Sequence, residues 1–169
     1  NTDLGNDLGN LVYRTLSMID RYCQGRLPAP GSAGGTADDE ALRQEAVGLA
    51  ERLDPALRAL NFSQALEMIF ALITRANRYI ETQAPWKLSK AGATDRLQAV
   101  LAVLTEVIRI VAVALEPFMP SVSQAIWEQL GMGAAPRTLA QMSAWPACPS
   151  GQALGPRAVL FPRPQLAKS

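Results

Sequence analysis

The stretch from Leu97 to Leu115 constrains the fold more than any other part of the 169-residue chain. Its apolar residues recur every three or four positions, and several more lie off that stripe, so a helix here is apolar nearly all round. Such a helix is stable in water only when other helices cover it. Glu106 and Arg109 interrupt the stretch, which argues against a membrane span. We therefore expect the central, most buried helix of a bundle, and no membrane partner.

Four other segments show the same helical periodicity. Gly- and Pro-rich stretches separate them, and these end helices because Pro lacks a backbone donor and Gly costs conformational entropy. Asp54-Pro55 is expected to break the second segment, and Ser63 to cap the third. The expected helices, besides the central one, cover about residues 4–19, 36–53, 66–80 and 120–130.

The composition changes at Gly131, after which prolines accumulate and helical periodicity fades. Residues 131–169 are therefore expected to form an extended tail packed over the helices, with at most a short strand at 158–161. The predicted fold class is all-α: a bundle of about five helices over residues 1–130 with an extended Pro/Gly-rich C-terminal tail. We expect residues 1–169 to form one domain.

The composition also excludes several chemistries. The chain has no His, so it can build no Ser-His-Asp triad, no Cys-His pair and no His-ligated metal site. Cys23 and Cys148 are too few for an all-thiolate zinc site, and free thiols in a reducing cytosol are expected rather than a disulfide. No paired carboxylates suggest acid–base catalysis. We expect no catalytic residue and no metal site.

The charge balance at first argues against a nucleic-acid partner. Sixteen Lys and Arg oppose fifteen Asp and Glu, giving a net charge of +1, whereas nucleic-acid binders usually carry a basic excess. The acidic residues are concentrated between residues 31 and 60. An anionic ligand is therefore expected to meet the protein elsewhere.

Asn10 and Arg14 form the first candidate binding pair. They lie four residues apart in an expected helix, which places both side chains on nearly the same face. An amide beside a guanidinium fork suits the recognition of a base edge or a phosphate. In the alternative interpretation, Asn10 bonds locally and Arg14 pairs with a surface carboxylate.

Pro85 and Trp86 form the second candidate feature. Pro85 is expected to end the third helix and to restrict Ala84, so that Trp86 emerges from a rigid turn at one end of the bundle. A Trp ring held there could stack on an unstacked base. In the alternative interpretation, Trp86 simply fills the end of the hydrophobic core.

Four sequence motifs, in family order, resemble the anticodon-binding domain of methionyl-tRNA synthetases, which are class I aminoacyl-tRNA synthetases. The segment 76–88, ANRYIETQAPWKL, is the most specific, and the opening segment 6–14, NDLGNLVYR, is also similar. The resemblance implies that Asn10, Arg14, Pro85 and Trp86 form the anticodon site, which recognises CAU with the Trp ring stacked on the cytosine. The other two motifs are 116–120, EPFMP, and 160–163, LFPR.

The resemblance also implies the wider function. The parent enzyme would use ATP to attach methionine to its tRNA for translation, in the cytoplasm or in an organelle's matrix. This chain would bind the anticodon loop of methionine tRNA as a monomer joined to an upstream catalytic domain, and it would need no cofactor itself. Neither a HIGH-type nor a KMSKS-type signature of that catalytic domain occurs here. A catalytically inactive C-terminal domain is therefore expected.

Two segments depart from the family pattern. The Gly/Pro-rich loop at residues 26–35 has no assignable role, and Pro164 stands where the family more often has an aliphatic residue. From the residues alone, one alternative of a different class remains open. It is a helical protein–protein interaction module that binds no nucleic acid.

Overall fold

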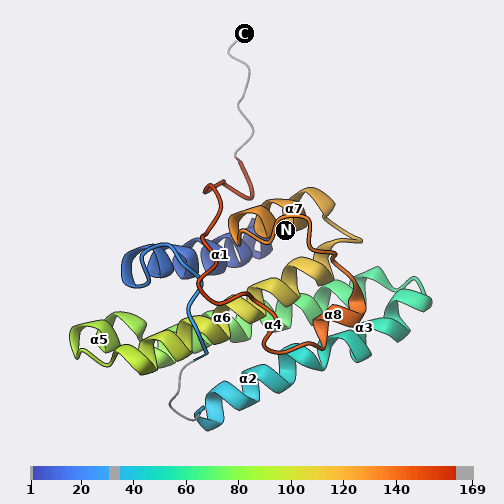
Figure 1. The fold of residues 1–169 in the computed structure, drawn as a ribbon. Coiled ribbons are helices and arrows are strands. Elements are labelled where there is room, and N and C mark those ends of the chain that lie inside the picture. Colours follow the sequence, from blue (N-terminus) through green and yellow to red (C-terminus); the bar gives the residue numbers. More distant parts are fainter. Residues whose placement is uncertain (1, 31–34, 163–169) are drawn as a thin grey trace.

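A computed structural model describes residues 2–30 and 35–162, with side chains from Gly5 onward, so Pro164 and residues 31–34 of the loop lie outside the described part. The described residues form an all-α fold, which confirms the predicted class (Figure 1). The bundle comprises α1 (Thr2–Tyr22), α2 (Ala37–Val47), α3 (Leu49–Arg58), α4 (Phe62–Gln83), α5 (Pro85–Lys90), α6 (Thr94–Leu115) and α7 (Pro120–Gln129), and the tail carries the short α8 (Leu139–Met142).

Helix α6 is the core of the fold, as its all-round apolar pattern predicts. It lies between α1 and α7 on one side and α2 on the other (Figure 1), and nearly every residue from Leu97 to Leu115 is buried. By length and composition alone α6 could cross a membrane, but 89% of its most apolar window is buried by the rest of the protein. Its apolarity is thus accounted for by packing against neighbouring helices.

The second expected helix divides at Gly48 and not at Asp54-Pro55, so that prediction was wrong. Gly48 ends α2, and α3 continues through Pro55 to Arg58. Pro55 is tolerated because it is exposed and its missing N–H removes only one bond from a short helix. The cap of α4 is Asn61, whose side chain accepts a hydrogen bond from the Gln64 backbone N–H at 3.2 Å, and not Ser63.

The predicted strand at residues 158–161 is absent from the described tail, since this segment lies beside a helix and has no strand to pair with. The tail instead turns through α8, crosses α6 and reaches α1 (Figure 1). One isolated antiparallel bridge joins Ala153 to Arg26, just after α1. Flanking backbone bonds run from Leu27 N–H to Gln152 O at 2.8 Å and from Leu154 N–H to Gly25 O at 2.9 Å.

A buried ion pair on α6 anchors the tail. Arg109 is 1% exposed, and its Nε donates to Glu106 Oε2 at 2.8 Å. The two Nη atoms donate to two tail carbonyls at 2.9 and 2.6 Å, and Glu106 Oε1 accepts from two consecutive tail N–H groups at 2.8 and 2.6 Å. The two charges that interrupt the apolar helix therefore satisfy tail backbone groups that would otherwise be buried without partners. These backbone groups belong to Gln141, Ala144, Ala147 and Cys148.

Both cysteines are free thiols, as expected. Burial raises the pKa of Cys23. Burial also raises the pKa of Cys148, and the negative charge of Glu106 raises it further. Neither thiol is activated as a nucleophile.

Candidate functional site

The junction between α4 and α5 positions Trp86. Ala84 adopts the left-handed conformation (φ 44°, ψ 66°) and its N–H donates to Ile80 O at 2.9 Å, which ends α4. Pro85 then occupies the first position of α5, where a missing N–H costs nothing. Trp86 therefore lies in a short helix that starts directly after the turn residue Ala84, whereas the sequence predicted that Trp86 emerges from the rigid turn itself. The left-handed residue lets a second helix start immediately after the first.

Arg14, Pro85 and Trp86 come together at one end of the bundle. The Arg14 guanidinium lies over the Trp86 ring, 5.8 Å from its centroid, and Arg14 Nη1 also contacts Glu81 Oε1 at 2.7 Å. Pro85 is buried, and Trp86 is half-buried against the core. Each alternative interpretation thus holds in part: Arg14 pairs with a surface carboxylate, and one part of Trp86 fills the core. The exposed part of the Trp86 ring stays available next to a fixed positive charge.

Asn10 lies one turn before Arg14 on α1 and is exposed. It does not belong to the Arg14–Trp86 contact itself. It faces a groove between α1 and the tail, beside that contact. The four candidate residues therefore fall into two groups: Arg14, Pro85 and Trp86 at the end of the bundle, and Asn10 one helical turn away at the groove.

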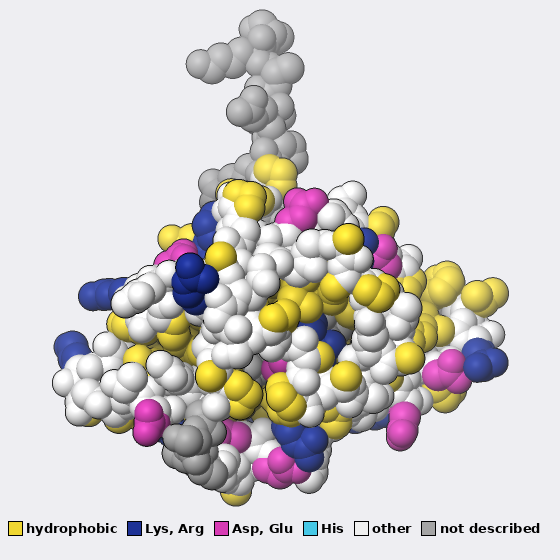
Figure 2. Space-filling model, viewed as in Figure 1, with side chains coloured by type: hydrophobic (Ala, Val, Ile, Leu, Met, Phe, Trp, Pro, Cys, Tyr) yellow, Lys and Arg dark blue, Asp and Glu magenta, His cyan; other side chains and the backbone are white. Residues whose placement is uncertain are grey.

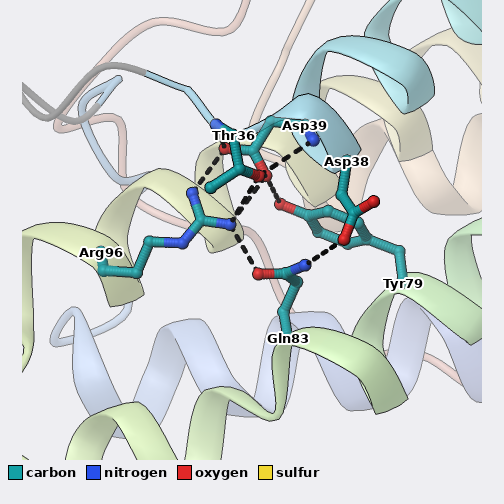
Figure 3. A network of polar contacts seen from close by, with 6 residues as sticks. All are labelled: Thr36, Asp38, Asp39, Tyr79, Gln83 and Arg96. Atoms are coloured by element: carbon teal, nitrogen blue, oxygen red, sulfur yellow. Dashed lines mark hydrogen bonds and ion pairs between the residues drawn. The ribbon is translucent and has the colours of Figure 1, made fainter.

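A polar network at the end of α4 was not predicted (Figure 3). Arg96, in the first turn of α6, donates to Asp39 Oδ1 at 2.8 Å and to Gln83 Oε1 at 2.6 Å. Tyr79 Oη donates to the same Asp39 oxygen at 2.6 Å, and Thr36 Oγ1 and N–H donate to the Asp39 carboxylate at 3.0 and 3.1 Å. The network joins the start of α2, the end of α4 and the start of α6, so it fixes the end of α4, which α5 with Trp86 directly follows.

The pKa values of this network follow from burial and hydrogen bonding. Burial alone would raise the pKa of Asp39, but hydrogen bonds from Arg96, Tyr79 and Thr36 outweigh it and hold that pKa well below its usual range. Burial, and then the bond to the Asp39 carboxylate, raise the pKa of Tyr79. Asp39 is thus a carboxylate and Tyr79 a neutral donor near pH 7. The sequence indicates only that Asp39 is an acidic residue in the first turn of a helix. No residue near it in the sequence predicts its contacts with Tyr79 and Arg96.

Two of the motifs that carry the family resemblance meet in space. The Phe161 ring lies against α1 where Gly5 and Gly9 have no side chains, since a Cβ built on Gly5 would be 3.6 Å from the ring. Next to it, Arg157 lies over the Tyr13 ring at 5.6 Å from the centroid. Between α1 and the tail is a groove of about 430 Å³, the α1–tail groove. Its lining includes Asn6, Asn10, Tyr13, Gln129, Arg157 and Phe161.

The surface charge around these features is mixed. On the face in Figure 2, basic and acidic side chains are interspersed and no continuous basic patch forms. Among residues 2–30 and 35–162, no three His, Cys, Asp or Glu side chains come close enough to hold a metal ion. The arrangement suits local contacts through an aromatic ring, an amide and a few guanidinium groups.

Comparison with known families assigns a class to this fold and site. Residues 39–159 match the family model described as the anticodon-binding domain of tRNA ligase, so the chain belongs to that family. Its similarity within the family is to methionyl-tRNA synthetases. It is 43% identical to the methionine–tRNA ligase of Synechocystis over 131 residues, and 37% identical to that of Halalkalibacterium halodurans over 164 residues.

A solved structure gives the same assignment. The chain superimposes on free Mycobacterium tuberculosis methionyl-tRNA synthetase with a TM-score of 0.87 and 38% sequence identity, covering 98% of this chain and 33% of that one. The alignments with the two curated relatives cover 78% and 96% of this chain, but only 24% and 25% of the relatives' own lengths. The chain therefore spans about a quarter of the curated relatives, and the family match is to their anticodon-binding domain.

Proposed function

We propose that this chain recognises the CAU anticodon of methionine tRNA, with residues 1–169 acting as the anticodon-binding domain. The observation that carries the proposal is the Arg14 guanidinium held 5.8 Å from the centroid of the half-buried Trp86 ring. Unstacked loop bases are recognised by aromatic stacking together with hydrogen bonds to their edges. An aromatic ring with a guanidinium held over it supplies both kinds of contact.

Each candidate residue has a distinct role in this proposal. Trp86 stacks on a splayed anticodon base, and Pro85 fixes the start of the helix that carries it. Arg14 and Asn10 hydrogen-bond base edges or the nearby backbone. Glu81 competes with the RNA for Arg14, because in the free chain its carboxylate lies 2.7 Å from the guanidinium.

The larger enzyme would supply the chemistry. The named relatives are methionine–tRNA ligases, and a solved complex of one contains methionyl-adenylate, which implies ATP as the co-substrate there. By analogy, an upstream catalytic domain would attach methionine to the tRNA that this domain selects. We propose that the protein acts as a monomer in the cytoplasm or in an organelle's matrix.

Binding of anticodon stem-loops tests the proposal. Trp86→Ala should weaken binding of the CAU stem-loop roughly 5- to 150-fold, since base–aromatic stacking contributes about 1–3 kcal/mol. Trp145→Ala is the matched control, because Trp145 lines a separate cavity between α2, α6 and the tail. Equal binding of CAU and anticodon-swapped stem-loops by the unaltered chain would favour a protein-interaction module instead.

A further inference from the structure

The tail places a second basic and aromatic pair on α1. Arg157 Nη2 donates to Ser17 Oγ at 2.8 Å and to Tyr13 O at 3.2 Å, and Nη1 lies 3.7 Å from Asp20 Oδ2. These contacts hold the guanidinium over the Tyr13 ring at 5.6 Å from its centroid. The chain thus presents a ring and a charge together at this point, as it does with Trp86 and Arg14.

Helix geometry puts Asn10 between the two pairs. At 100° per residue, Arg14 lies about 40° to one side of Asn10 around α1 and Tyr13 about 60° to the other. Trp86 covers the Arg14 side, and Arg157 covers the Tyr13 side. The α1–tail groove opens on that second side.

The groove has polar and aromatic groups that the proposed anticodon contacts leave unused. Tyr13 is 69% exposed, which is unusual for a large aromatic side chain that has no ligand. Gln129 also lines the groove; it is only 3% exposed, and its Nε2 has no hydrogen-bond partner among the described residues. A buried donor without an acceptor costs stability and is rare in folded proteins. An oxygen of a ligand bound in the groove would supply the acceptor that Gln129 Nε2 lacks.

We propose that the α1–tail groove is a second nucleotide site for the same RNA loop, occupied by a nucleotide next to the base that stacks on Trp86. Tyr13 supplies a stacking surface for its base, Arg157 contacts its phosphate, and Gln129 Nε2 donates to a base or ribose oxygen. Aromatic rings that alternate with basic groups are the usual means of binding single-stranded RNA. The proposal rests on the proposed function, because the same RNA must engage Trp86.

Binding of a CAU stem-loop to the chain, measured over a range of salt concentrations, tests this site. Tyr13→Ala should weaken binding about 5- to 10-fold, and Tyr13→Phe should restore it if the ring is what matters. Arg157→Gln should weaken CAU and anticodon-swapped stem-loops equally and reduce the salt slope by about one. Arg58→Gln is the matched control, since Arg58 is an exposed arginine on α3 whose partner is Asp54.

The outcomes separate this proposal from the proposed function. If Trp86→Ala impairs binding while Tyr13→Ala and Arg157→Gln bind like the unaltered chain, the second site is refuted and the anticodon function stands. If all three variants bind like the unaltered chain, the proposed function itself fails. A urea midpoint for each variant within the error of the unaltered chain excludes unfolding as the cause of lost binding. If Arg157→Gln lowers that midpoint, the exposed Tyr13 variants decide the question.

Discussion

Replacing Arg109 with Met should destabilise the fold strongly through an orphaned charge. Arg109 is 1% exposed and is the counter-ion of Glu106, which is itself 4% exposed. The Met side chain fills a similar length but leaves the Glu106 carboxylate buried without a cation. Two tail carbonyls that accept from Arg109 at 2.9 and 2.6 Å also lose their donors.

The expected cost is about 4 kcal/mol of unfolding free energy. Removing one partner of a buried ion pair costs about 3–5 kcal/mol. Each buried acceptor left unsatisfied adds about 1–3 kcal/mol, although the tail can detach to hydrate its carbonyls and so reduce that addition. With a urea m-value of about 2 kcal/mol/M, the midpoint should fall by about 2 M.

Urea denaturation followed by far-UV circular dichroism measures this cost, and limited proteolysis of residues 139–148 reports release of the tail. The double variant Glu106→Leu/Arg109→Met is the control, since it removes both charges. It should recover about half of the loss, because only the tail backbone groups remain without partners. A loss below about 1 kcal/mol in the single variant, or a double variant no more stable than the single one, would refute the reasoning.

Three further predictions concern the polar network, a close backbone approach and the candidate site. Asp39→Asn should lower the free energy of unfolding by about 3 kcal/mol at pH 7 and by progressively less below about pH 4. The pKa of Asp39 is lowered in the folded chain, so its stabilising contribution is complete above the unfolded pKa and is lost as the pH falls toward the folded pKa. Urea titrations of both chains at pH 7 and pH 3 measure this difference. Gly155→Ala should lower the free energy of unfolding by about 2 kcal/mol in thermal unfolding, because the added Cβ would lie 1.9 Å from a carbonyl oxygen of α7. Gly92→Ala is the comparison: no atom lies near its Cβ, and only the φ of +67° is unfavourable, so the loss should be about 1 kcal/mol. Glu81→Gln should raise affinity for the CAU stem-loop about two- to fivefold at low salt by freeing Arg14, and weaker binding would contradict the proposed competition.

The all-α fold was predictable because helical periodicity is a local property of the sequence. The stretch 97–115 is buried in α6 as its pattern indicates. Helix boundaries were less predictable where two signals compete. Pro55 predicts a helix break, but it lies on the exposed side of α3, and the helices divide at Gly48 instead. The helices divide at Gly48, although the sequence signal there is weak, because α2 and α3 each pack separately against α4.

The candidate site was only partly predictable. The spacing of Asn10 and Arg14 places both on one helix face, but no pattern connects Arg14 to Trp86, which lies far away along the chain. The pairing of Tyr13 with Arg157 was missed because the tail has no periodicity that indicates where it docks on α1. Two charges three residues apart in an apolar helix are, in retrospect, the one local signal of an anchor for the tail.

The return of the tail to α1 has a consequence for the order of folding. Its contacts with α1 and with the turn that follows α1 join residues 124 to 156 positions apart, so we expect them to form after the helices have docked. We expect the tail to be the last element to fold and the first to open in native-state hydrogen exchange. A molecule that has lost it would keep almost all of its helical signal yet lack the α1–tail groove. Helicity alone is therefore a poor measure of whether the molecule is competent to bind.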